Sequence, residues 1–129
     1  MSSFLFFTPP FKTPTNKQKI VLIPKDIREK SELFNLFSTQ LEFPLYFGAN
    51  WDALYDCLRD LNWILENEIL IIHEDIPLKV AESEEKKYLE LLLDVLISWQ
   101  NDNNHHLAIF FPEEEKSKIQ KILADINTT

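Results

Sequence analysis

Glycine, cysteine and long apolar runs are scarce in this sequence, and each shortage excludes a class of structure. The chain has one glycine, Gly48, and one cysteine, Cys57, so no internal disulfide can form and a reducing compartment is expected. No run reaches the ~18 apolar residues that a membrane-spanning helix requires. The apolar segment 4–7 is too short for a secretory signal, and no basic residue precedes it. We therefore expect a cytoplasmic protein.

The sequence also has no excess of basic side chains. The formal net charge is −8 at pH 7, which argues against binding to nucleic acid or to an anionic membrane. Residues 42–75 hold eight acidic side chains and one basic one, Arg59, so this segment carries −7 of the net charge. Such a concentration of charge favours encounter with a basic partner.

The length and composition predict one domain. A chain of 129 residues with 45% hydrophobic content can bury one core. Three prolines interrupt residues 9–14, so we expect an N-terminal arm over 1–18, or an edge strand followed by a loop. Residues 19–129 then form a single domain that ends in a helix over 113–126.

Three short apolar runs predict buried strands, over 19–24, 68–73 and 106–111. Their apolar residues are continuous rather than alternating, which is typical of a parallel sheet covered on both faces.

Helical spacing of apolar residues between the strands predicts helices over 31–40, 51–61 and 83–99, with Ser31, Asn50 and Ser83 as N-caps. The sequence therefore predicts an α/β fold, with a small three-stranded parallel sheet and helices packed on it.

The segment 41–58 contains the residues that bear most directly on function. We expect Gly48 to take a positive φ and bend the chain, and Asn50 to start the following helix. Helical geometry places Leu54, Cys57 and Leu58 on one side of that helix. Asp52, Asp56 and Arg59 fall on the opposite side, with Tyr55 beside them. The helix therefore shows solvent two carboxylates one turn apart, next to an aromatic ring.

Other interpretations of these residues stay open at this point. Asp52 and Asp56 are a possible catalytic pair, although no nucleophile, phosphate loop or histidine lies close in sequence. Most such pairs are simply the solvated face of an amphipathic helix. The histidines at 73, 105 and 106 lack partners at zinc-ligand spacing, so we expect no metal and no cofactor.

The run from Pro44 to Leu58, with sequence PLYFGANWDALYDCL, closely resembles the central segment of the barstar family, which inhibits secreted ribonucleases of the barnase type. The shared pattern is Pro, Tyr-aromatic-Gly, Asn, Asp-Ala-Leu, aromatic, Asp-Cys-Leu. The resemblance implies that the loop and the following helix block a ribonuclease active site, with acidic side chains in place of RNA phosphates.

The same resemblance assigns roles to individual positions. Asp56 matches the dominant contact of the family, and Asp52 matches the second acid of the same helix. Ala49 and Phe47 depart from the pattern, since an acid and a tyrosine are usual at those positions. The residues that the match assigns to partner binding are Tyr46, Gly48, Asn50, Trp51, Asp52, Tyr55 and Asp56, together with Asp94 on the next helix.

The function expected from this resemblance is that of an inhibitor or immunity protein. It binds a basic ribonuclease toxin, does no chemistry itself, and needs neither nucleic acid nor a membrane. A barstar-like binding module whose partner is not a nuclease is the alternative, and an enzyme is the third choice.

Overall fold

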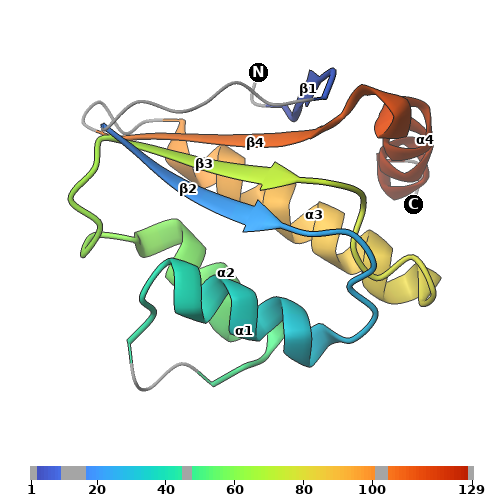
Figure 1. The fold of residues 1–129 in the computed structure, drawn as a ribbon. Coiled ribbons are helices and arrows are strands. Elements are labelled where there is room, and N and C mark those ends of the chain that lie inside the picture. The colour runs from blue at the N-terminus through green and yellow to red at the C-terminus, as the bar shows by residue number, and fades with distance from the viewer. Residues whose placement is uncertain (1–2, 10–16, 45–47, 101–104, 128–129) are drawn as a thin grey trace.

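The computed structural model describes residues 3–9, 17–44, 48–100 and 105–127 of the chain. Within them the sheet has four strands in the order β1-β4-β3-β2, and all neighbouring strands are parallel (Figure 1). The strands are β1 (Leu5–Phe7), β2 (Gln18–Ile23), β3 (Glu68–His73) and β4 (His106–Pro112). The predicted α/β fold with a parallel sheet is confirmed.

The sheet is one strand wider than the predicted three. The additional strand, β1, pairs with β4 through Leu5 and Phe110, and Phe4 packs edge-on against Phe111 with ring centroids 5.0 Å apart. The sequence left residues 1–18 open between an arm and an edge strand, because three residues followed by prolines give too short a pattern for periodicity to decide. The strand forms because β4 offers a free edge for pairing. This edge lies far from β1 in sequence, so the local pattern of β1 does not reveal it.

The described residues form four α-helices and one short 3₁₀ turn. They are α1 (Lys30–Gln40), α2 (Trp51–Asp60), α3 (Glu82–Trp99), the turn η1 (Glu113–Glu115) and α4 (Lys116–Asn127). Helices α1, α2 and α3 lie on one side of the sheet, and α4 lies near the end of β4 (Figure 1). No helix in the described part of the chain is long and apolar enough to cross a membrane.

Two of the three predicted N-caps are wrong. Helix α1 is capped by Glu29 instead of Ser31, and the side chain of Glu32 accepts a hydrogen bond from the Glu29 N–H at 3.4 Å. Helix α3 is capped by Ala81 instead of Ser83, and the N–H groups of the third and fourth helical residues donate to the Ala81 carbonyl. Acidic residues in the first turn suit the positive end of a helix, so both helices begin before the serine.

Alternate residues of the strands form the core between the sheet and the three helices. Val21, Ile71 and Phe111 are fully buried against Phe37 of α1 and Leu92 of α3. Leu22, whose side chain points to the other face of the sheet, is 54% exposed. The helices α1–α3 thus share one continuous core, which fixes how α2 and α3 lie relative to each other.

Candidate functional site

Helix α2 begins where the sequence predicts, at the cap residue Asn50. The Asn50 side-chain oxygen accepts a hydrogen bond from the Ala53 N–H at 2.8 Å, and its amide donates to the Gly48 carbonyl at 3.4 Å. The positive φ predicted for Gly48 is wrong, because the left-handed residue is Ala49, with φ of 50°. The bend therefore falls one residue closer to the helix, at a residue type that adopts this conformation less readily than glycine does.

Buried contacts hold α2 firmly against the core. Leu54 and Leu58 are fully buried, and the indole N–H of Trp99 on α3 donates to the Leu58 carbonyl at 2.9 Å. Cys57 is also buried, and burial is the largest of the causes that raise the pKa of its thiol. The apolar side of α2 is thus committed to the core, and its opposite side is the part available to a partner.

Trp51 joins three helices instead of projecting into solvent. Its indole N–H donates to Glu84 of α3 at 2.9 Å, and its ring packs edge-on against Phe34 of α1 at 5.1 Å between centroids. Lys30 of α1 completes the cluster with an ion pair of 3.3 Å to Glu84. The half-buried Trp51 consequently fixes the start of α2 relative to α1 and α3.

A groove between α2 and α3 brings together four of the residues singled out from the sequence. Its volume is about 170 Å³, and α2 contributes Trp51, Asp52 and Tyr55 to its lining. Helix α3 contributes Asp94 together with Lys87, Glu90 and Leu91. Asp52, Glu90 and Asp94 are all exposed. Two residues 42 positions apart in sequence, Asp52 and Asp94, thereby face one hollow of the surface.

Glu90 is a groove residue that sequence reasoning missed. It lies four residues before Asp94, so both carboxylates occupy the same side of α3. That spacing was available in the sequence. The family resemblance assigns only Asp94 on this helix, so Glu90 is identified only from the exposed side of α3 as a whole.

Asp56 lies beside this groove and carries a contact of its own. Its side chain is 68% exposed and accepts a hydrogen bond from the guanidinium of Arg59 at 2.8 Å. The guanidinium carbon of Arg59 also lies 4.4 Å from the centre of the Tyr55 ring. Asp56, Arg59 and Tyr55 therefore form one exposed cluster on α2. Tyr46, the remaining predicted contact residue, lies outside the described residues.

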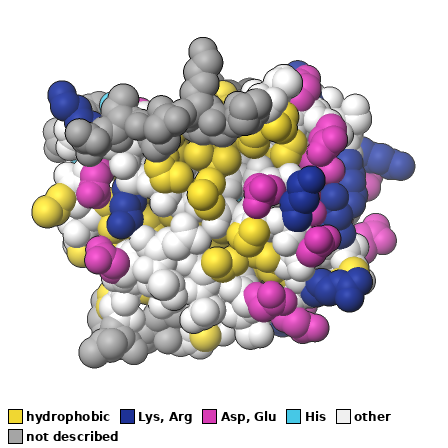
Figure 2. Space-filling view, viewed as in Figure 1, with side chains coloured by type: hydrophobic (Ala, Val, Ile, Leu, Met, Phe, Trp, Pro, Cys, Tyr) yellow, Lys and Arg dark blue, Asp and Glu magenta, His cyan; other side chains and the backbone are white. Residues whose placement is uncertain are grey.

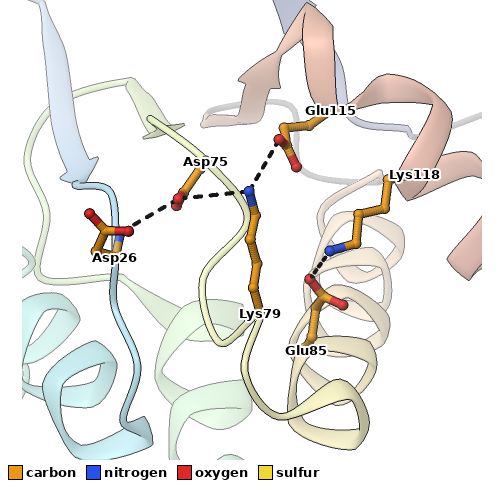
Figure 3. Close-up of polar contacts among 6 residues, drawn as sticks. All are labelled: Asp26, Asp75, Lys79, Glu85, Glu115 and Lys118. Atoms are coloured by element: carbon orange, nitrogen blue, oxygen red, sulfur yellow. Dashed lines mark hydrogen bonds and ion pairs between the residues drawn. The ribbon is translucent and has the colours of Figure 1, made fainter.

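A second polar cluster occupies the end of the sheet where β2, β3 and β4 finish (Figure 3). Lys79 lies 3.2 Å from Glu115 and 3.8 Å from the buried Asp75, which also accepts from the Asp26 N–H at 3.5 Å. Burial is the main cause that raises the pKa of Asp75. One oxygen of Asp75 and one of Glu115 have no hydrogen-bond partner in the described structure.

Ligands of open α/β sheets often bind at this edge, but the second cluster is already paired within the chain. The chain's own Lys79 lies between the carboxylates, and the buried Glu85 is paired with Lys118 of α4 at 2.9 Å (Figure 3). Charged side chains of both signs gather near the start of α3 and near α4 (Figure 2). In the described residues, no group of three or more His, Cys, Asp or Glu side chains has a geometry that holds a metal ion. The ion pairs Lys79–Glu115 and Lys118–Glu85 attach η1 and α4 to the rest of the fold.

The arrangement on α2 and α3 is suited to binding a cationic partner. The exposed carboxylates lie on two rigid helices, and the nearest thiol is buried. His73, the last residue of β3, is fully buried and hydrogen-bonded to Tyr88. Fixed carboxylates of this kind bind arginine and lysine side chains.

Comparison with known protein families gives a match that agrees with this geometry. The model of the family described as Barstar (barnase inhibitor) matches residues 18–112, from the first residue of β2 to the last residue of β4. No curated protein matches the chain. The matched region includes α2, α3 and the groove between them, whereas β1 and α4 lie outside it. Because the match spans well over half of its residues, the chain belongs to the barstar family, a family of ribonuclease inhibitors.

Proposed function

We propose that this protein inhibits a basic ribonuclease of the barnase type and protects the cell that produces it from that toxin. The surface that binds the ribonuclease is formed by Asp52, Tyr55, Asp56, Glu90 and Asp94, and is called the α2–α3 acidic surface below. The observation that carries the proposal is the shared groove, where Asp52 of α2 and Asp94 of α3 present carboxylates to one site. Membership of an inhibitor family supports the same conclusion.

The electrostatic basis of inhibition is substitution of carboxylates for phosphates. A ribonuclease site that binds RNA is lined by cationic side chains, and arginine accepts a carboxylate as readily as a phosphate oxygen. The backbone positions of these acids are fixed by α2 and α3, so little loop entropy is lost on binding. Gly48 and Asn50 lie directly before α2, and the family resemblance assigns partner contacts to both of them and to Tyr46.

Inhibition in this proposal requires no chemistry from the chain itself. The thiol of Cys57 is buried, and its raised pKa disfavours the nucleophilic thiolate. Burial lowers the pKa of His73 to about 3, so this imidazole is neutral and enclosed at physiological pH. The protein acts by occupying the ribonuclease site.

A binding module with a non-nuclease partner is the second candidate. The observation that favours it is the presence of Arg59 and Lys87 among the acids of the α2–α3 acidic surface. A partner for such a surface must accommodate the positive charges of Arg59 and Lys87, and must also supply positive groups for the acids. That requirement does not single out a nuclease, and a regulatory protein that presents groups of both signs meets it.

The experiment that tests the proposal is inhibition of RNA cleavage by purified barnase. We expect inhibition to saturate at one inhibitor per enzyme, and Asp52→Ala and Asp94→Ala each to weaken it. Glu114→Ala, an exposed carboxylate of η1, is the matched control that also removes one negative charge. Undiminished cleavage at excess inhibitor would contradict the ribonuclease assignment. Metal-dependent hydrolysis by the chain alone, lost in Asp52→Asn, would instead favour an enzyme.

A further inference from the structure

The charge of Arg59 is opposite in sign to that of the acids around it. It is the one basic residue among the acids of segment 42–75, and its guanidinium donates to Asp56 at 2.8 Å. The same guanidinium covers the Tyr55 ring at 4.4 Å. Two of the five residues of the α2–α3 acidic surface are therefore in contact with a cation from their own helix.

In the free protein this contact is easily exchanged. Arg59 is 45% exposed and Asp56 is 68% exposed, and an ion pair in such surroundings contributes little to stability. The arginine is thus able to leave Asp56 when a stronger partner arrives. It cannot leave the region, however, because its backbone is fixed one turn along α2.

Binding of a partner raises the free-energy cost of leaving a charge unpaired beside Asp56. When a partner covers Asp56, water leaves the contact and the guanidinium of Arg59 is enclosed with it. A charge removed from water without a partner is strongly unfavourable, and so is a like charge placed beside it. A partner that presents only cations to Asp56 would set its own positive charge against Arg59.

The groove repeats this mixture of charges. Lys87 lines it together with Asp52, Glu90 and Asp94, so the acids of α3 are also interrupted by a cation. An interface with both signs on one side requires both signs on the other.

We infer that Arg59 determines the specificity of the α2–α3 acidic surface by selecting a partner whose cationic group lies beside a carboxylate. The cationic group binds Asp56 and Asp52, and the carboxylate receives the guanidinium displaced from Asp56. The inference rests on the proposed function only in that this surface binds a partner, and it does not require the partner to be a ribonuclease.

The test compares two probe peptides on the intact protein by NMR titration of backbone amides in α2 and α3. One peptide is an arginine hexamer, and the other is a hexamer in which arginine alternates with glutamate. The variant is Arg59→Met, which removes the charge and keeps an unbranched side chain over Tyr55. Arg28→Met, at an exposed position before α1, is the control because it changes the net charge by the same amount. Thermal unfolding of both variants verifies that each is folded.

We expect Arg59→Met to tighten binding of the all-arginine peptide about threefold more than Arg28→Met does, and not to tighten binding of the alternating peptide. Equal effects of the two substitutions would show that net charge alone acts, and would overturn the inference. It would also be overturned if both peptides gained equally from Arg59→Met, or if neither peptide shifted the amides of α2 in any form of the protein. Barnase inhibition is measured separately, so failure of the ribonuclease assignment and failure of this inference are distinguishable.

Discussion

His73 hydrogen-bonds two other elements from the end of β3. Its Nδ1 lies 2.9 Å from the carbonyl oxygen of Phe110 on β4, and its Nε2 lies 2.7 Å from the hydroxyl of Tyr88 on α3. Because a carbonyl only accepts, Nδ1 carries the proton and Nε2 accepts from the tyrosine. The ring also stacks on Phe111 at 3.9 Å between centroids. This neutral histidine joins the sheet to α3 inside the core.

Acid should therefore destabilise the protein through His73. Its pKa is about 3 in the folded chain, mainly because of burial, against about 6.5 for an unfolded histidine. The unfolded state takes up the proton first, so stability is lost as the pH falls from about 6.5 towards 3, by at most ~1.4 kcal/mol per pH unit. Urea unfolding of wild type and His73→Gln over this range measures the effect. A slope that His73→Gln leaves unchanged would contradict it, and His106→Gln, at an exposed position, is the control.

Asp75 should have the opposite dependence on pH. Its pKa is raised in the folded state, first by burial, so the stability it contributes is present at low pH and is lost as the pH rises through the folded pKa. We expect Asp75→Asn to raise the free energy of unfolding at pH 8, by about 1 kcal/mol or less, and to change it less at pH 3, below the pKa of about 3.9 of an unfolded aspartate. Urea denaturation at both pH values measures this. A loss of stability at pH 8 would show that the Lys79 contact outweighs the burial of charge.

At the scale of elements, the turn before α2 places Ala49, whose backbone is strained, next to Gly48, a residue type that tolerates most backbone conformations. Ala49 has φ of 50°, while a side chain added to Gly48 would meet only Asn50 Nδ2 at 3.2 Å and Ala53 Cβ at 3.8 Å. We expect Ala49→Gly to stabilise the protein by about 1 kcal/mol, because glycine adopts a left-handed conformation without steric cost. Gly48→Ala should be mildly destabilising, because its Cβ would press on the side-chain amide of Asn50, which caps α2. Denaturant unfolding of both variants decides between the two positions, and a larger loss from Gly48→Ala than gain from Ala49→Gly would contradict this view.

The cap of α2 is the complementary prediction at this scale. Asn50→Ala removes the acceptor of the Ala53 N–H and should cost about 0.5–2 kcal/mol of stability. Asn50→Asp keeps an acceptor and should restore most of that loss. If Asn50→Ala is neutral in the same unfolding assay, the cap has no energetic role.

The elements that sequence reasoning identified are those with strong local patterns. Continuous apolar runs gave β2, β3 and β4, and the spacing of Leu54 and Leu58 gave the buried side of α2. Local patterns left β1 open between an arm and an edge strand, because its pairing depends on the edge of β4. They misplaced the starts of α1 and α3, where acids compete with serine for the first turn. The juxtaposition of Asp52 with Glu90 and Asp94 depends on how two helices pack, which no spacing within one helix encodes.

At the scale of the whole molecule, net charge should govern how fast a partner is found. The charge of −8 lies mostly in segment 42–75, and ions screen such a field over about 8 Å at physiological ionic strength. We expect the association rate with barnase to fall steeply as salt increases, while the dissociation rate changes little. Stopped-flow measurements from low to high salt provide the test. An association rate that does not depend on salt would argue against electrostatic steering.

The central claim is that the exposed acids of α2 bind the cationic site of a ribonuclease. Its most direct test is the dissociation rate of Asp56→Ala from barnase, compared with that of Asp60→Ala, an exposed acid at the last residue of the same helix. Removing Asp56 should leave the cations of the ribonuclease buried without a partner, at a cost of at least about 2 kcal/mol, or roughly 30-fold in dissociation rate. Folding stability should be nearly unchanged, because Asp56 is exposed. Equal dissociation rates for the two variants, or unfolding of Asp56→Ala, would contradict the account.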